Sequence, residues 1–407
     1  MPTRQYDFNM YREFMATQLP KALQPAKVVA NPPLRYWPDV DDYTMSCGMD
    51  ITPAGRVWLA WFAGGDNEDA VVVLAYSDDG GMTFSKPQFI LDPGYADCGI
   101  HLSAVVANLW TTPDGRLFLF FTQSLGYFDG RSGSWFSVCE NPDSEQPVWS
   151  QPVRIWHGAS LNKPTVLSNG TWLLPISLWP ANYEKIEKKL QDPKGPRFNF
   201  FSELEDQRGV NIFASRDLGK SWERIGHVRN ARELSTFDEP MIVERKDGSL
   251  LMYMRITNGT TQSISTDGGL TWTTPERTSF TNASARFFLR KLQSGNLLLI
   301  RHANPDAPLE RSFMTAYISK DDGRTWLGGL LLDERKGISY PDGFQTSDGR
   351  IHIQYDYKRE CGEILMAVFK EEDVLAGKNV SGFVLLKHPV VQSYTANHSQ
   401  TQQRLPR

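Results

Sequence analysis

Residues that could transfer protons or bind an anion recur at one distance from a series of glycine turns. Glu239, Arg286 and Tyr340 each stand nine residues before such a glycine, and Arg255 stands seven residues after the glycine that Glu239 precedes. A carboxylate, a phenol and guanidinium groups at equivalent positions could exchange a proton and hold an acidic ligand. Alternatively, Glu239 and Arg255 simply pair with each other, because buried ionisable groups need partners.

The glycine turns count the structural units that must position these residues. Six glycines each open a short apolar run, and successive glycines lie 47 to 78 residues apart; they are Gly55, Gly115, Gly170, Gly248, Gly295 and Gly349. This period is typical of the four-stranded blades of a β-propeller. The sequence therefore predicts an all-β fold, a six-bladed β-propeller, with the polar residues gathered at one rim around its axis.

A second repeat, Ser/Thr-x-Asp-x-Gly-x-Ser/Thr-aromatic, supports the same architecture. It occurs four times, beginning at Ser77, Ser215, Ser265 and Ser319. Asp and Ser/Thr side chains can bond turn amides, and glycine can take a positive φ, so the pattern suits a tight hairpin. We expect these hairpins to lie on the face opposite the polar rim and to have no catalytic role.

The repeats also predict the domain organisation. They run without a break from about residue 45 to 370, which favours one propeller domain over residues 45–385. No Asp pattern follows the sixth glycine turn, so the segment 1–44 is expected to supply the closing strand of the last blade. Residues 386–407 are expected to form a polar C-terminal tail.

Composition excludes several classes of function. The net charge of −4 and the absence of a basic stretch argue against a nucleic-acid partner. No run of 18 apolar residues and no apolar core near the N-terminus are present, so we expect no membrane association and a cytoplasmic location. The four cysteines are isolated from one another, which indicates neither a metal site nor a disulfide framework. No cofactor is expected.

The two repeats, with the order of Glu239, Arg255, Arg311 and Tyr340, resemble the sialidase (neuraminidase) superfamily, specifically its bacterial branch with BNR repeats, or Asp boxes. In that family a glutamate opens the fourth blade and an arginine follows sixteen residues later, as Arg255 follows Glu239. A further arginine precedes a late Asp box by eight residues, as Arg311 does here. A tyrosine opens the last blade, as Tyr340 does.

The resemblance implies a role for each of these residues. Tyr340 would be the nucleophile and Glu239 its base, because a phenol with a pKa of about 10 needs a carboxylate to take its proton. Arg255 and Arg311 would form two thirds of an arginine triad that clamps the carboxylate of an acidic sugar. The family's acid/base aspartate would lie in the loop 64–69, where Asp69 is favoured over Asp66 and Glu68.

The chain departs from the family at the first arginine of the triad, where Met45 stands instead. Arg286 and Lys163 are basic residues that could replace it and bind an acidic sugar. A structural ion pair is the alternative role for each of them.

Three functions follow. The first is an exo-acting glycoside hydrolase that removes a terminal acidic sugar, sialic acid or a uronic or related sugar, from an oligosaccharide. The second is a uronate-directed polysaccharide lyase, for which Tyr340 or one of the histidines His101, His157 and His302 could act as the base. The third is a carbohydrate-binding propeller without catalytic activity. The sequence does not indicate an oligomeric state.

Overall fold

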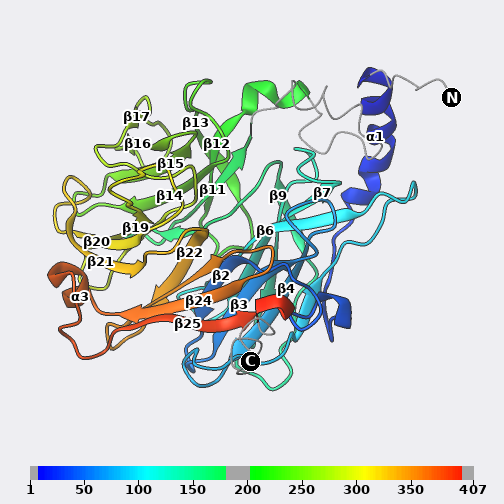
Figure 1. Ribbon diagram of the computed structural model, residues 1–407. Helices are drawn as coiled ribbons and strands as arrows, with labels where there is room; N and C mark the ends of the chain where they lie inside the picture. Colours follow the sequence, from blue (N-terminus) through cyan, green and yellow to red (C-terminus); the bar gives the residue numbers. More distant parts are fainter. Residues whose placement is uncertain (1–7, 180–201, 397–407) are drawn as a thin grey trace.

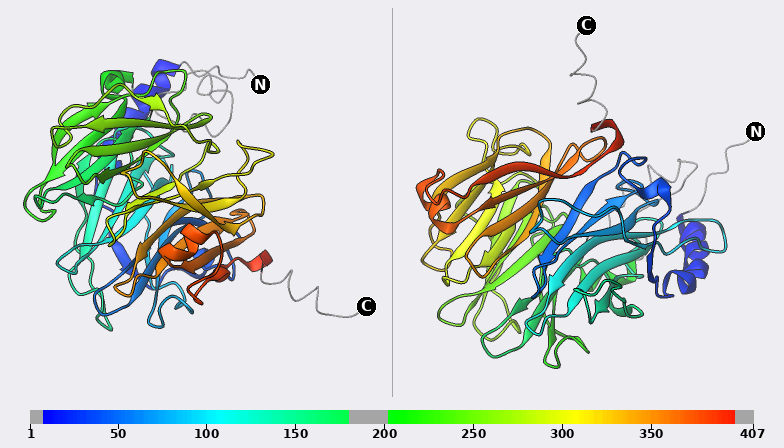
Figure 2. Two further views of the ribbon diagram at one scale, coloured as in Figure 1. Left: turned by 90° about the vertical axis from the view of Figure 1, so that its left-hand side faces the viewer. Right: turned by 90° about the horizontal axis from the view of Figure 1, so that it is seen from below.

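Six antiparallel sheets follow one another along the chain and surround a common axis, as the computed structural model shows (Figure 1). The structure describes residues 8–179 and 202–396. The six-bladed β-propeller predicted from the glycine turns is confirmed. Figure 2 shows the ring in two further views, with the last blade, orange to red, beside the first, blue. Contacts between β2 and β22 close this ring.

Each blade is built from strands that are consecutive in the sequence. The first sheet contains β1 (Val28–Ala30), β2 (Met45–Ile51), β3 (Val57–Ala63), β4 (Val71–Ser77) and β5 (Phe89–Leu91). The second contains β6 (Leu102–Thr111), β7 (Leu117–Leu125), β8 (Ser134–Cys139) and β9 (Val153–Trp156). The third contains β10 (Thr165–Val166), β11 (Trp172–Leu178), β12 (Gly209–Ser215) and β13 (Glu223–Val228).

The remaining blades follow the same order. The fourth contains β14 (Asp238–Glu244), β15 (Leu250–Ile256), β16 (Gly259–Ser265) and β17 (Glu276–Arg277). The fifth contains β18 (Phe288–Lys291), β19 (Leu297–His302), β20 (Met314–Ser319) and β21 (Leu327–Asp333). The sixth contains β22 (Ile338–Gln345), β23 (Ile351–Tyr357), β24 (Glu363–Phe369) and β25 (Leu385–Gln392). The helical segments are α1 (Phe8–Ala22), η1 (Leu34–Tyr36), η2 (Ser202–Gln207) and α3 (Glu371–Ala376).

The six turn glycines connect the innermost strand of each blade to the next strand outward. All six have a positive φ, between 81° and 97°. At Gly248 a Cβ would meet no atom within 4 Å, so the backbone conformation rather than lack of space requires glycine there. The turns thus lie at the far ends of the inner strands, away from the rim where those strands begin.

Counted outward from the axis, the third strand of a blade is joined to the fourth by each of the four Asp boxes. In the box of the fifth blade, the Ser319 hydroxyl donates to Asp321 Oδ1 at 2.8 Å and accepts from the Gly323 amide at 2.8 Å. The Asp321 carboxylate also accepts from the amide and the hydroxyl of Thr325, at 2.8 and 2.6 Å. Because each box satisfies its own turn and lies on the same face as the glycine turns, its role is structural.

The predicted closure of the ring by the N-terminal segment is wrong. β1 pairs with β5 at the outer edge of the first blade, and β25 supplies the fourth strand of the last blade. The predicted tail 386–407 therefore begins inside a strand. β25 was missed because its burial is mostly partial and Pro389 interrupts its apolar pattern.

The blades pack through large apolar side chains. Trp58 is fully buried and meets Trp149 edge to face, with the ring centroids 5.7 Å apart. Trp110 meets Trp172 in the same way at 4.7 Å. Such packing makes the inner strands rigid supports for the residues at their ends. In the described ranges, no helix has the length and apolar character needed to span a bilayer.

Candidate active site

Tyr340 and Glu239 meet where two inner strands begin. The Tyr340 hydroxyl donates a hydrogen bond of 2.6 Å to Glu239 Oε1, so a residue of β22 contacts a residue of β14 from another blade. The exposed fractions are 8% for Tyr340 and 1% for Glu239. The contact between phenol and carboxylate that the sequence suggested is thus present in the fold.

The backbone is strained at both residues. Tyr340 has a φ of 56° and Glu239 a φ of 43°, values that residues with a side chain rarely adopt. The strand register shifts at the same points, between Asp238 and Met241 and between Ser339 and Asp342. Bulges of this kind re-aim side chains and concentrate at functional sites. The strain therefore turns these two side chains toward each other.

Two of the predicted arginines flank this pair. Arg255 Nη1 donates to Glu239 Oε1 at 2.8 Å and to the Tyr340 hydroxyl at 3.3 Å. Arg311 lies beside the Tyr340 ring, with its guanidinium carbon 5.9 Å from the ring centroid. Arg311 bonds only neutral oxygens, those of the Ser339 hydroxyl and the Ser284 carbonyl. Within the described chain, Arg311 makes no ion pair with a carboxylate, so its charge is available to an anion.

A third arginine, Arg359, was missed by the sequence analysis. Its guanidinium carbon lies 4.9 Å from the centroid of the Tyr340 ring, and its Nη1 lies 3.1 Å from the sulfur of Met45. Arg359 comes from the turn between β23 and β24, yet it reaches the position where the first blade lacks an arginine. One feature of the sequence could have pointed to Arg359. It lies ten residues after the turn glycine Gly349 and three after Asp356, with which it pairs at 3.4 Å.

The loop 64–69 presents Asp66 rather than Asp69 to this cluster. Asp66 accepts a hydrogen bond from the Tyr127 hydroxyl and lies 3.8 Å from Arg359 Nη1. Asp69 is exposed, and its backbone amide donates to the Asn67 side chain. In residues 8–179 and 202–396, no hydrogen bond or ion pair joins the Asp69 carboxylate to the cluster. Counting residues from an Asp box favoured Asp69, whereas the contact with Arg359 favours Asp66.

Arg286 and Lys163 lie in the axis of the propeller instead of facing a substrate. Arg286 is 1% exposed and donates to the Asn162 side chain, to the carbonyls of Cys47 and Leu161, and to Asp342 at 3.0 Å. Lys163 donates to the carbonyls of Met49 and Leu109 and lies 3.2 Å from both Asp50 and Asp342. The structure therefore favours the alternative role, a structural ion-pair network, over the predicted binding of substrate.

None of the histidines considered as bases makes a hydrogen bond to Tyr340 in the described part of the chain. His101 contacts Asp92 at 3.2 Å and the Glu68 carbonyl at 2.7 Å. His157 contacts Arg154 at 3.0 Å. His302 is fully buried and donates from Nε2 to the Ile338 carbonyl at 2.9 Å, and burial lowers its pKa to about 4. Each ring is thus held by protein partners.

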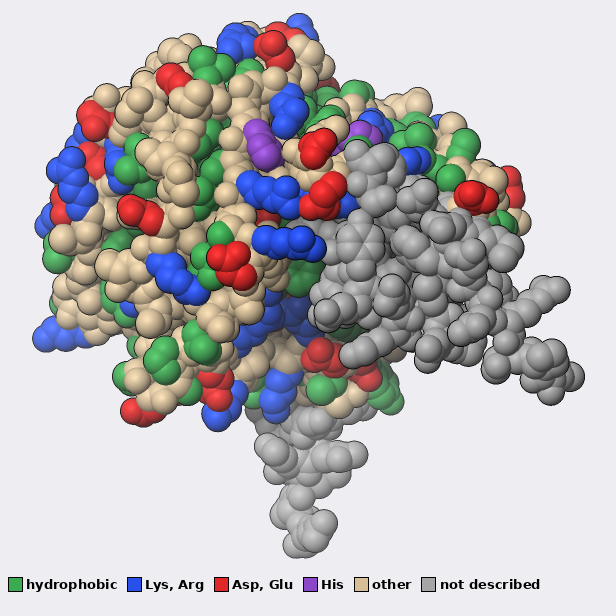
Figure 3. Space-filling view, turned by 90° about the horizontal axis from the view of Figure 1, so that it is seen from above, with side chains coloured by type: hydrophobic (Ala, Val, Ile, Leu, Met, Phe, Trp, Pro, Cys, Tyr) green, Lys and Arg blue, Asp and Glu red, His purple; other side chains and the backbone are tan. Residues whose placement is uncertain are grey.

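The electrostatics of the cluster suit a protonated phenol at rest. Burial raises the pKa of Tyr340 well above its usual value, and the neighbouring Glu239 carboxylate raises it further. Arg255, Arg359 and Arg311 act in the opposite direction. Seen from above, the molecule has Lys and Arg side chains gathered around a hollow in this face (Figure 3). A cationic hollow of this kind attracts anionic ligands.

Asp238, next to Glu239, leads to a prediction about pH. Burial raises the pKa of Asp238 to about 7, and its Oδ1 accepts from Asn230 at 2.9 Å. Because this pKa lies above the unfolded value, the stabilisation from Asp238 is complete below about pH 3.9 and is lost as the pH rises toward 7. We expect Asp238→Asn to be more stable than the wild type at pH 8 but not at pH 4.5, as measured by urea unfolding. Equal stability differences at the two pH values would contradict this.

Comparisons with known proteins agree with this architecture. The family model for the BNR repeat-like domain matches residues 55–353. No curated protein matches the chain in sequence.

Solved structures share the fold at low sequence identity. A protein of unknown function from Dyadobacter fermentans has a TM-score of 0.58 at 13% identity, over 82% of this chain and 94% of that one. A Hadza microbial sialidase has a TM-score of 0.58 at 17% identity, over 82% and 66% of the two chains. The intramolecular trans-sialidase of Ruminococcus gnavus, in complex with oseltamivir carboxylate, has a TM-score of 0.58 at 14% identity, over 85% and 98%. At these identities the likeness shows the fold alone.

Proposed function

Because the chain belongs to the family of BNR repeat-like domains, we propose that it is a glycoside hydrolase that removes a terminal acidic sugar from an oligosaccharide. The observation that carries the proposal is the hydrogen bond between Tyr340 and Glu239 among three arginines. A carboxylate that is hydrogen-bonded to a buried phenol can accept the phenolic proton when the phenol acts as a nucleophile. The sialidase-like fold supports a carbohydrate ligand.

The proposed reaction has two steps and retains the configuration of the sugar. The Tyr340 oxygen bonds to the anomeric carbon while Glu239 takes the phenolic proton and the glycosidic bond breaks. Asp66 protonates the departing oxygen. Asp66 then takes a proton from water as the water oxygen attacks the anomeric carbon, and Tyr340 leaves and regains its proton from Glu239.

The charges around Tyr340 explain why the nucleophile would be a phenol. An acidic sugar with its carboxylate at or near the anomeric carbon would repel a carboxylate nucleophile, whereas a neutral phenol approaches without this cost. Arg255, Arg311 and Arg359 would bind the sugar carboxylate through charge-assisted hydrogen bonds. Arg359 thus takes the part of the arginine that Met45 replaces.

The proposal is tested by a screen of acidic glycosides and uronate-capped oligosaccharides, in which released monosaccharide and ultraviolet absorbance are followed together. Hydrolysis releases the sugar without new absorbance, whereas a lyase produces an unsaturated uronate that absorbs. Binding without turnover would indicate a carbohydrate-binding propeller. Asp66→Asn and Asp69→Asn variants in the same assay decide which carboxyl is the acid/base, since Asp69 remains the alternative.

Arg359 is expected to determine affinity for the acidic substrate. Arg359→Met should lower kcat/KM by about 10- to 100-fold, mainly through KM, because one charge-assisted contact to the sugar carboxylate is lost. The double variant Arg359→Met with Met45→Arg should recover part of this loss, since the two side chains meet at the same place.

Arg350→Met is the matched control for this variant. Arg350 stacks on Phe383 with its guanidinium carbon 4.8 Å from the ring centroid, much as Arg359 stacks on Tyr340, but it lies beside the Gly349 turn. Its replacement should leave KM unchanged. An unchanged KM in Arg359→Met would remove Arg359 from the binding site.

A further inference from the structure

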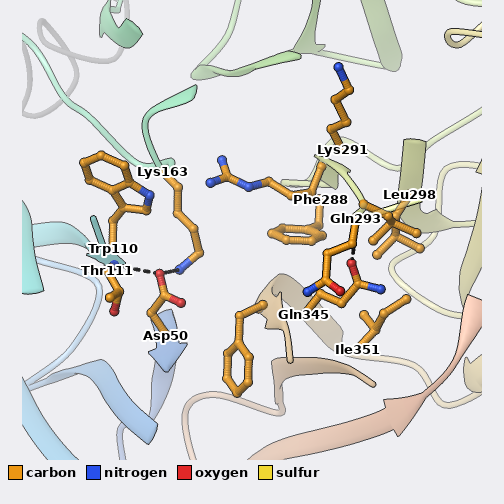
Figure 4. A pocket seen from close by; sticks show the side chains of 14 residues that line it. Asp50, Trp110, Thr111, Lys163, Phe288, Lys291, Gln293, Leu298, Gln345 and Ile351 are labelled. Atoms are coloured by element: carbon orange, nitrogen blue, oxygen red, sulfur yellow. Dashed lines mark hydrogen bonds and ion pairs between the residues drawn. The ribbon is translucent and has the colours of Figure 1, made fainter. Parts of the chain in front are cut away.

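A second cavity lies at the other end of the propeller axis. Its volume is about 230 Å³, and the side chains that line it come from the ends of inner strands, including Asp50, Lys163, Lys291 and Gln345 (Figure 4). Gln345 lies five residues beyond Tyr340 on β22, about 16 Å along the strand at about 3.3 Å per residue. The cavity is therefore distinct from the candidate active site.

The carboxylates near this cavity are already paired. Asp342 bonds Arg286 at 3.0 Å and Lys163 at 3.2 Å, and Asp50 bonds Lys163 at 3.2 Å. Asp50 Oδ2 also accepts from the Thr111 amide at 2.9 Å (Figure 4). Asp50 is the only carboxylate among the lining residues described by the structure, and its charge is offset by Lys163.

Two further cations at the cavity have no such partner. Arg290 is half-buried and donates from Nη1 to the Pro164 carbonyl at 2.9 Å. Within residues 8–179 and 202–396, Arg290 makes no ion pair, and the adjacent Lys291 makes neither an ion pair nor a side-chain hydrogen bond. Burial lowers the pKa of Arg290, and the more distant Asp50 and Asp342 offset this only in part. A half-buried guanidinium that has no carboxylate partner would be stabilised by an anion that enters the cavity.

We propose that this cavity binds a small oxyanion, a carboxylate or phosphate group, through Arg290 and Lys291. The guanidinium fork matches the geometry of both groups, and Lys291, which also lines the cavity, adds a second positive charge. A cavity of about 230 Å³ has room for inorganic phosphate or a single sugar acid.

The test is calorimetric titration with inorganic phosphate and, separately, with glucuronate, at constant ionic strength set with chloride. It is performed in an Arg359→Met background, which weakens anion binding at the other end of the axis. We expect saturable binding of at least one of the two anions, and the stronger one identifies the group. Arg290→Met should weaken this binding at least tenfold, and Lys291→Met, an exposed change that leaves folding intact, severalfold.

Arg324→Met is the control, because Arg324 is an exposed cation in an Asp box on the same face. It should leave the affinity unchanged. The proposal is overturned if neither anion binds the Arg359→Met protein, if Lys291→Met and Arg290→Met bind as well as their parent, or if Arg324→Met weakens binding as much as they do. None of these outcomes depends on hydrolase activity, so the proposed function stands or falls separately.

Discussion

Tyr340→Phe should lose hydrolytic activity by about 10³-fold or more in kcat while keeping its fold and its affinity for the substrate. The substitution removes one oxygen, the atom that would bond to the anomeric carbon, and leaves the ring against Arg359 and Arg311. The three arginines that would bind the sugar carboxylate remain. The measurement is single-turnover kinetics on the best substrate of the screen, with affinity determined separately by titration.

Tyr253→Phe is the matched control for this prediction. Tyr253 is buried like Tyr340, with 1% of its surface exposed against 8%, and its hydroxyl donates to the Gly323 carbonyl at 3.4 Å in an Asp box away from the candidate active site. This variant should keep full activity. If Tyr340→Phe turned over substrate at close to the wild-type rate, the phenol would not be the nucleophile. If it bound no carbohydrate, the hydroxyl would instead have a binding role.

The second large effect is expected on stability. Arg286→Met should lower the free energy of unfolding by about 3–5 kcal/mol, because the buried carbonyls of Cys47 and Leu161 each lose a charged donor and Asp342 keeps Lys163 as its only cationic partner among the described residues. The carbonyls of Cys47 and Leu161 belong to the first and third blades, so the loss loosens several blades at once. Urea unfolding at constant pH measures this effect through the shift in the midpoint.

Two further variants keep this prediction testable. Arg286→Lys retains the charge but not the fork, so it should be intermediate in stability, and it remains measurable if Arg286→Met does not fold. Arg216→Met removes an exposed arginine that pairs with Glu223 at 3.1 Å, and it should change stability by less than about 0.5 kcal/mol. If the Arg286→Met variant were as stable as the wild type but bound substrate poorly, Arg286 would have the substrate-binding role predicted from the sequence.

Much of the fold could be predicted because it rests on local rules that repeat. Each turn glycine marks a position that needs positive φ, and each Asp box marks a turn that bonds its own amides. These signals gave the six blades and their order, which the structure confirms. The closing strand could not be predicted in this way, because β25 follows α3 and carries neither repeat. Its place in the blade depends on its pairing with β24, which is a tertiary contact.

For the site, the sequence identified residues but not their partners. Counting from the glycine turns placed Glu239, Tyr340 and Arg286 at one level, yet the first two meet each other while Arg286 turns into the axis. The difference lies in the strand bulges and in the positive φ of Glu239 and Tyr340, which no spacing rule describes.

Local chemistry along the chain is enough to specify the propeller, the number of its blades and the end of each blade where a polar residue stands. Closing the ring decides the rest, because it brings together residues that are far apart in sequence. Arg359 reaches the place of Met45 from the opposite end of the chain, and Asp66 rather than Asp69 contacts Arg359. The sequence does not distinguish the basic residues from one another. The tertiary structure places Arg286 and Lys163 in the ion-pair network of the axis and Arg311 and Arg359 beside Tyr340.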